Sequence, residues 1–259
     1  MSSNMSLQLS PDLTKDTNEI GLILEAREIV RAIKSFTLEK CPEVDQILQF
    51  YRSRTPTNIT NRDVLTELCW IGYSSGFRFD IISKYWGAIR EAFYGFDVMK
   101  VALLANDLEK QALRVCNETG FRNFRKAKWC IQNAQRIIEI ENDMQHIGGL
   151  RGFFVELSKV SPFDLLKLAP SIIRELKFKG IGKTTVFHLM KNVGLDVFKP
   201  DIHVRRILNK LGLIDSENAC VMEIFGAMKF LSFASGIRIN ELDTLLFVYG
   251  KNTGDKLNS

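Results

Sequence analysis

One carboxylate in the sequence stands where it could take part in chemistry. Asp201 follows Pro200, which sets a turn, and it stands where the next helix is predicted to begin. An aspartate at that position caps the first amide groups of the helix, and their hydrogen bonds favour its ionised form. An ionised carboxylate can stabilise an oxocarbenium-like sugar or orient an attacking water, as cleavage of a glycosidic bond requires. A helix cap without a catalytic role is the simpler interpretation of Asp201 taken alone.

A glycine turn earlier in the chain could bind an anion. An apolar helix runs into Gly180 and a second helix is predicted to begin near Lys183, so that a Gly-Ile-Gly turn joins the two. Glycines allow positive φ and a close approach of the backbone, and the start of a helix attracts anions. We predict that Gly180, Gly182, Lys183 and Thr184 contact a phosphate of a nucleic-acid backbone, a contact that carries no base sequence information.

The same turn has two other interpretations. A connection between two helices without any ligand has the same pattern. A nucleotide-binding P-loop also ends in Gly-Lys-Thr, as residues 182–184 do. However, Lys177 stands where that motif has its first glycine, and a helix is predicted where the motif needs a strand. The P-loop is therefore disfavoured, and the connector remains an alternative.

Aromatic residues between positions 70 and 86 could hold a base or replace one. Aromatic rings stack on bases and attract cationic ones, and an apolar side chain can fill the gap that an extruded base leaves. We predict that Phe77 is such a wedge and that Trp70 and Phe79 line a base pocket. Packing in the core is the alternative for these rings, and it is the favoured interpretation for Tyr85 and Trp86.

The cysteines and histidines do not suggest a metal site. The five cysteines are scattered and form no C-x-x-C pair, which is typical of free thiols in a reducing, intracellular compartment; in a bacterium this would be the cytoplasm. The three histidines lack the spacing of metal ligands, so we predict no metal and no other cofactor. His203 is expected to face either the core or a nucleic acid.

Helical periodicity dominates the chain that must position these residues. Apolar residues recur at helical spacing, and no sustained alternation predicts a large sheet, so we expect an all-α fold of about ten helices. Residues 1–20 are polar and lack a signal-peptide pattern, which predicts a loose tail before a globular part at 21–255. No apolar run is long enough for a membrane helix. The net charge of +5 permits a nucleic-acid partner without requiring one.

The hairpin followed by Asp201 resembles the helix-hairpin-helix, Gly/Pro-rich-loop, Asp (HhH-GPD) superfamily of DNA glycosylases, with Lys179 in place of the usual hairpin proline. The resemblance implies that Asp201 is the catalytic aspartate. Bifunctional members carry a nucleophilic lysine where this chain has Thr184, so a monofunctional enzyme is implied. Some members also bind an iron–sulfur cluster through four cysteines near the C-terminus, where this chain has only Cys220, and no such cluster is expected.

A second stretch is similar to 3-methyladenine DNA glycosylase I. The similar segments are 74–79, 90–97 and 126–134, and they place the wedge at Gly76-Phe77 and a base-stacking ring at Phe79. Two features of that enzyme are missing: its pocket acid aligns near Ile71, and its zinc ligands are absent.

The resemblance implies two helical lobes that flank a DNA-binding cleft. One lobe is expected at about 60–185, with the hairpin, and the other at 21–59 plus 186–255. The expected activity is excision of a base from double-stranded DNA by a monomer, with an alkylated purine such as 3-methyladenine as the leading substrate. Oxidised guanine or a modified base of foreign DNA stays open. So do a non-catalytic DNA-binding module and a helical protein that binds no nucleic acid.

Overall fold

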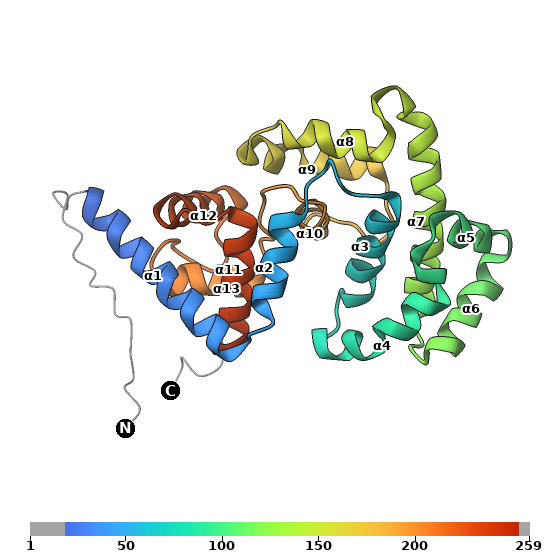
Figure 1. The fold of residues 1–259 in the computed structure, drawn as a ribbon, viewed down its shortest axis with the longest axis horizontal. Helices are drawn as coiled ribbons and strands as arrows, with labels where there is room; N and C mark the ends of the chain where they lie inside the picture. The colour runs from blue at the N-terminus through green and yellow to red at the C-terminus, as the bar shows by residue number, and fades with distance from the viewer. Residues whose placement is uncertain (1–18, 254–259) are drawn as a thin grey trace. The chain divides into compact units, whose positions relative to one another are not determined.

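A computed structural model describes residues 19–253 of the chain. Over that range the secondary structure consists of thirteen α-helices and three short 3-10 helices, without a strand (Figure 1). The expected all-α class is therefore confirmed. The number of α-helices exceeds the expected ten or so, and the segment from 94 to 107 consists of short pieces, η1, α5 and η2. Of the expected N-terminal tail, residues 1–18 lie outside the described part, and Glu19 already begins the first helix.

The α-helices and 3-10 helices (η) follow one another in this order along the chain: α1 (Glu19–Lys40), α2 (Val44–Ser53), α3 (Asn61–Ser74), α4 (Phe79–Ala92), η1 (Tyr94–Phe96), α5 (Val98–Leu103), η2 (Leu104–Asp107), α6 (Leu108–Thr119), α7 (Phe124–Asp143), η3 (Gln145–Ile147), α8 (Gly149–Ser158), α9 (Pro162–Leu176), α10 (Thr185–Asn192), α11 (Ile202–Lys210), α12 (Val221–Ser235) and α13 (Ile239–Thr253).

The chain forms two compact units. The central unit comprises residues 50–199, and the terminal unit comprises the residues before 50 together with those from 200 onward. Helix α2 spans the first boundary. Helix α10 belongs to the central unit, together with the hairpin, whereas the sequence predicts a lobe boundary near residue 185.

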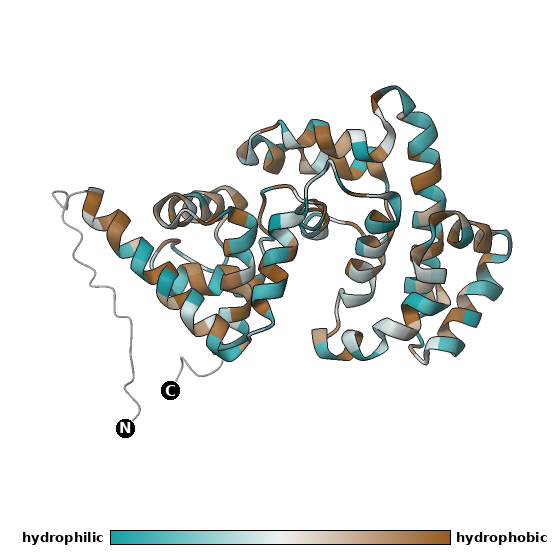
Figure 2. Ribbon diagram, viewed as in Figure 1, coloured by the Kyte–Doolittle hydropathy of each residue, from teal (hydrophilic) through white to brown (hydrophobic). Residues whose placement is uncertain are grey.

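Helix α7 lies at the centre of the packing in the central unit. Its side facing the core carries buried apolar residues at helical spacing, among them Ala127, Ile131 and Ala134, and it packs against α3, α5, α6 and α8. The Asn123 side chain caps its first turn by accepting a hydrogen bond from the Lys126 amide at 3.2 Å. Figure 2 shows hydrophobic and hydrophilic residues alternating along most helices, as amphipathic helices require.

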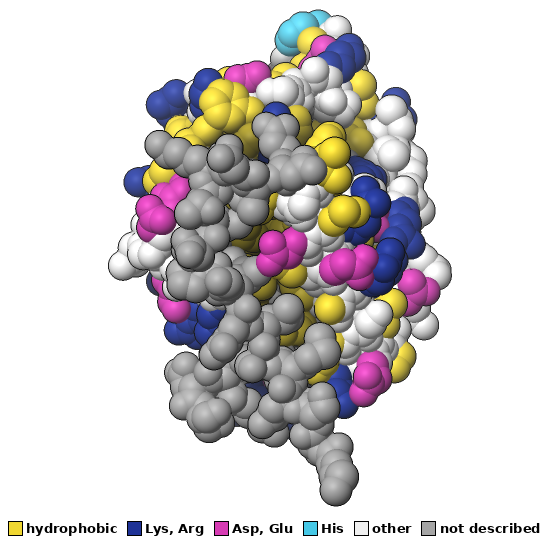
Figure 3. Space-filling model, turned by 90° about the vertical axis from the view of Figure 1, so that its left-hand side faces the viewer, with side chains coloured by type: hydrophobic (Ala, Val, Ile, Leu, Met, Phe, Trp, Pro, Cys, Tyr) yellow, Lys and Arg dark blue, Asp and Glu magenta, His cyan; other side chains and the backbone are white. Residues whose placement is uncertain are grey.

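In the terminal unit, α1 packs against α12 and α13, and α11 packs against α13. The Arg27 guanidinium donates to the carbonyl of Ala234 at 3.0 Å, which ties α1 to the end of α12. On the face drawn in Figure 3, described acidic and basic side chains are interspersed rather than separated by sign. Between residues 19 and 253, no helix is long and apolar enough to cross a membrane.

Candidate active site

The turn between α9 and α10 is left-handed at Gly180, where φ is +78°. A Cβ atom at that position would lie 2.8 Å from Cε3 of the Trp129 ring, so the close packing leaves no room for a side chain. The Asn133 side chain binds the neighbouring residue twice: Oδ1 accepts from the Lys179 amide at 2.7 Å, and Nδ2 donates to the Lys179 carbonyl at 3.1 Å. The sequence therefore needs a glycine here for space as well as for conformation.

The start of α10 offers amide groups to a ligand. Gly182 N–H is occupied, because it donates to Thr185 Oγ1 at 2.7 Å. In the described structure the amides of Lys183, Thr184 and Thr185 donate no backbone hydrogen bond outside the helices. The first amides of any α-helix lack a partner within the helix, and these are the amides at the start of α10. The residues from 182 to 184 are exposed, so an anion could reach these amides from solvent.

Asp201 is the N-cap of α11, as the sequence predicts. Its Oδ1 accepts from the amides of His203 and Val204 at 3.0 and 3.1 Å. One turn later, the Arg205 guanidinium donates to the carbonyl of Pro200 at 3.3 Å and also binds the Ala219 carbonyl. The carboxylate is therefore held in one orientation by the helix that follows it, and the preceding turn is held by Arg205.

His203 is half-buried and packs against α13 in the terminal unit. Its ring meets the Phe247 ring edge to face, with 5.2 Å between centroids, and its Cβ lies against Gly250. A packing role, one of the two roles expected for this histidine, is thus supported. In the described part of the chain, no three histidine, cysteine, aspartate or glutamate side chains gather closely enough to hold a metal ion.

Two of the three predicted aromatic site residues come together. The Trp70 ring lies edge to face with Phe79, at 5.5 Å between centroids, and with Trp86, at 4.9 Å. Trp70 and Trp86 are half-buried, and Phe79 is 53% exposed. The cluster at the junction of α3 and α4 is therefore open to solvent. Trp86, for which the sequence favours a core position, is one of its members.

The third predicted aromatic residue, Phe77, has different neighbours. It lies in the turn between α3 and α4 and is 41% exposed. Its ring packs edge to face on Phe121, at 5.1 Å, and lies 4.8 Å from the Lys126 ammonium. The preceding residue, Gly76, has a φ of +78°. The ring is therefore open to solvent on one side, while Phe121 and the Lys126 ammonium contact it on the other.

A buried carboxyl group in the central unit was not predicted from the sequence. Glu67 on α3 accepts from Asn192 Nδ2 at 2.7 Å, and its other oxygen lies 4.0 Å from the Arg54 guanidinium. Burial raises the pKa of Glu67 to about 7, against the opposing effects of Arg54 and Asn192. A signal was available: position 67 shares the apolar face of α3 with Val64 and Ile71, both buried.

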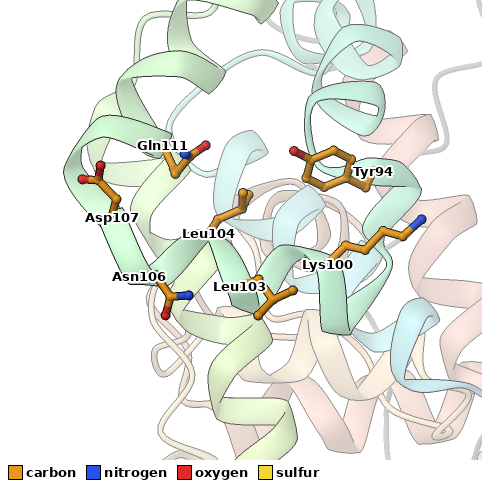
Figure 4. Close-up of a pocket in the computed structure, with 7 residues that line it drawn as sticks. All are labelled: Tyr94, Lys100, Leu103, Leu104, Asn106, Asp107 and Gln111. Carbon is orange, nitrogen blue, oxygen red and sulfur yellow. The ribbon is translucent and has the colours of Figure 1, made fainter.

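The structure also contains a pocket of about 300 Å³ on the central unit (Figure 4). It is formed by η1, α5, η2 and α6, and Tyr94 is its one aromatic lining residue. It is lined by Tyr94, Lys100, Leu103, Leu104, Asn106, Asp107 and Gln111. No residue that the sequence predicts for the site is among them, so the candidate site and this pocket are separate features.

Comparison with known proteins gives a family and a fold. The sequence model of the family described as methyladenine glycosylase matches residues 55–198, which is more than half of the chain. The matched range includes the hairpin and the aromatic cluster, and it nearly coincides with the central unit. It ends before Asp201. No curated protein matches the chain.

Solved structures of 8-oxoguanine DNA glycosylases are similar over most of the chain. The Thermotoga maritima enzyme has a TM-score of 0.56 at 19% identity, covering 86% of this chain and 95% of that one. The Methanocaldococcus jannaschii enzyme has a TM-score of 0.54 at 20% identity, covering 92% and 96%. The glycosylase/lyase from the same organism, bound to a 15-mer DNA containing 8-oxoguanine, has a TM-score of 0.53 at 16% identity, covering 88% and 98%. These similarities establish the expected helix-hairpin-helix glycosylase fold.

Proposed function

This chain belongs to the methyladenine glycosylase family, and from that premise we propose that it is a monofunctional DNA glycosylase. It hydrolyses the bond between deoxyribose and an alkylated purine, such as 3-methyladenine, after the base has left the stack of duplex DNA. The family match carries the reaction class. The choice of an alkylated base rests on the open cluster of Trp70, Phe79 and Trp86, whose electron-rich rings attract a cationic base.

Asp201 is the proposed catalytic residue. In the reaction the bond between C1′ and the base nitrogen breaks, and the base leaves with the electron pair. An alkylated cationic base leaves neutral, so it needs no strong general acid. The ionised carboxylate stabilises the positive sugar, and water then forms the new bond to C1′ while its proton passes to the carboxylate and on to solvent. The two amide hydrogen bonds to Oδ1 hold the carboxylate in the fixed orientation that this role requires.

The hairpin is the proposed grip on the DNA backbone. The amides of Lys183 and Thr184 lie at the start of α10, and the exposed Lys183 side chain adds positive charge to this end of the helix. A phosphate bound there would be held by hydrogen bonds and by the helix dipole. Such a contact fixes the protein on the duplex and leaves recognition of the base to the aromatic residues.

The lyase step is proposed to be absent. A glycosylase that also cuts the strand attacks the sugar with an amine, and Thr184 offers a hydroxyl where the resemblance places that amine. Lys183 is the adjacent amine. Borohydride trapping on a duplex with an abasic site decides the point. We expect no covalent product, and trapping that is lost in Lys183→Met would show that Lys183 supplies a lyase activity.

The test of the proposed function is release of free base from DNA. Wild-type protein is incubated with methylated DNA and, separately, with 8-oxoguanine and uracil duplexes, alongside Asp201→Asn and Asp215→Asn. Asparagine keeps an oxygen for the two amides that Asp201 caps, so the fold should persist while base release falls by about 10²-fold or more. The exposed Asp215 serves as the matched control and should leave the rate unchanged.

Each outcome assigns a function. Release of 3-methyladenine by the wild type but not by Asp201→Asn supports the proposal. Release of 8-oxoguanine alone would move the substrate to that of the enzymes with similar structures. DNA binding without release of any base would favour a non-catalytic clamp built on the same hairpin.

A further inference from the structure

Lys126 is a buried lysine on α7 whose ammonium group binds carbonyl groups at the end of another helix, α3. The residue is 4% exposed. Its Nζ donates to the carbonyls of Gly72 at 2.6 Å, Tyr73 at 3.1 Å and Ser75. These carbonyls belong to the end of α3 and the turn after it, where helical partners are missing and positive charge is favoured. All three donors of the ammonium group thus have an acceptor, which offsets the cost of burying it.

The turn that Lys126 holds carries Phe77. The ammonium that binds the three carbonyls is the one that lies 4.8 Å from the Phe77 ring centroid, and the Phe77 amide donates to the Ser74 carbonyl at 3.1 Å. Burial, with a smaller contribution from Arg125, lowers the pKa of Lys126 to about 8. The amine is therefore mainly protonated at neutral pH, with its three donors in place.

Asn133 plays the same part for the hairpin. It is buried, and it binds both the amide and the carbonyl of Lys179. One turn further along α7, the Arg136 guanidinium donates to the carbonyls of Leu176 at 3.0 Å and Glu175 at 3.1 Å, which caps the end of α9. Lys126 and Asn133 are two helical turns apart, or about 10 Å along the axis, which is about three base-pair steps of duplex DNA.

We propose that Lys126 and Asn133 are positioning residues through which α7 holds the two DNA-contacting segments in register. Lys126 fixes the turn that presents the wedge Phe77, and Asn133 fixes the hairpin that grips the phosphate. A single stiff helix thereby sets the distance between the point where the base is displaced and the point where the backbone is held. This inference rests on the proposed function, because it assigns the two segments the roles given to them there.

Loss of Lys126 and loss of Asn133 should affect different measurements, base extrusion for the first and DNA affinity for the second. A merely structural role of the two residues would not produce that difference. Lys126→Met keeps the apolar stem and removes the ammonium. Its control is Lys128→Met, which removes a charge from the same helix, at a side chain that binds Glu109 on the surface. Asn133→Ala is paired with Asn142→Ala, an exposed asparagine of α7. Base extrusion is followed by the fluorescence of 2-aminopurine beside an abasic-site analogue, and affinity is followed by anisotropy over a range of salt concentrations.

For Lys126→Met we expect DNA affinity within about twofold of wild type and a fluorescence rise reduced at least fivefold. For Asn133→Ala we expect affinity reduced at least fivefold and a slope of log affinity against log salt smaller by about one. Its fluorescence rise at saturating protein should be retained. Neither control should change either measurement.

Hydrogen exchange of the amides of residues 75–78 in the free proteins gives a readout that needs no DNA. Exchange should be faster in Lys126→Met than in wild type or Lys128→Met, and Lys126→Arg, which keeps a charge and several donors, should restore slow exchange. If the methionine variant does not fold, Lys126→Gln replaces it, because glutamine has no charge and too few donors for three carbonyls; its exchange should also be faster than that of wild type. Unchanged exchange, or an equal loss of affinity and extrusion in both test variants, would overturn the inference. A wild-type protein that neither extrudes nor releases any base would instead refute the proposed function, and the wedge role with it.

Discussion

Replacing Glu67 by glutamine should make the protein more stable at pH 8 and leave its stability nearly unchanged at pH 5. The Glu67 side chain is 13% exposed on α3. Its hydrogen bond from Asn192 survives the change, because glutamine also offers an oxygen. The Arg54 guanidinium is 4.0 Å away and gives the carboxylate only partial compensation. The variant therefore differs from wild type mainly in having no buried charge to form.

The size of the effect follows from the pKa. Burial raises the pKa of Glu67 from 4.5 to about 7, so between those values the folded protein binds more protons than the unfolded chain. The stability that this carboxyl contributes is present at low pH and is lost as the pH rises through the folded pKa. At about 1.4 kcal/mol per pKa unit, the loss between pH 5 and pH 8 is about 2.5 kcal/mol.

The measurement compares wild type, Glu67→Gln and Glu109→Gln by thermal unfolding at pH 5, 6, 7 and 8. Contributions of all other groups cancel in the difference between wild type and variant, and Glu109 is an exposed carboxylate whose replacement should give no trend. For a chain of this length the expected relative shift in Tm between pH 5 and pH 8 is about 5–10 °C in favour of Glu67→Gln. Parallel curves for wild type and Glu67→Gln would refute the argument, because they would mean that Glu67 is ionised in the fold across this range.

Three further predictions concern the candidate site. Gly180→Ala should lower the free energy of unfolding by about 1–3 kcal/mol, because it forces a side chain into a left-handed turn against Trp129. Gly182→Ala should change stability little, because a Cβ atom at that position has no neighbour within 4 Å. Equal urea midpoints for the two variants would contradict this prediction. Asp201→Ala should cost about 1 kcal/mol through the lost helix cap, whereas Asp201→Asn should cost only a few tenths; equal losses in chemical denaturation would mean that the cap contributes nothing. Phe77→Ala should reduce the 2-aminopurine signal without changing the salt slope, since the role proposed for the ring is that of a wedge and not of a phosphate contact; an unchanged signal would remove Phe77 from that role.

The sequence predicts well the features that depend on residues nearby in the chain. The cap at Asp201 and the turn at Gly180 are local patterns, recognisable from an aspartate after proline and from two glycines between apolar helices. Their conformations depend on residues only a few positions away. The all-α class is likewise visible in the spacing of apolar residues.

Local patterns could not identify Lys126 and Asn133, the residues proposed to position the site. Lys126 binds carbonyls more than fifty residues earlier, and Asn133 binds a residue 46 positions later. Carbonyls at a helix end carry no sequence signature, so no pattern tells which distant side chain will satisfy them. Glu67 shows the same difficulty in another form: its partner Asn192 is 125 positions away, and only its place on an apolar face indicates burial.

In the proposed function, the residues for recognition and the residue for chemistry fall in different units of the chain. The family match covers the hairpin, the proposed wedge Phe77 and the aromatic cluster, all in the central unit, and it ends before Asp201, which belongs to the terminal unit. Two hydrogen bonds from its own helix orient the Asp201 carboxylate, because it accepts from the amides of His203 and Val204. Changes in the central unit should therefore alter which base is taken and how tightly DNA is held. A change at Asp201 should lower kcat while leaving affinity for DNA close to that of the wild type. A variant of the aromatic cluster that lowered kcat equally for every base would contradict this division, because a recognition residue must discriminate between substrates.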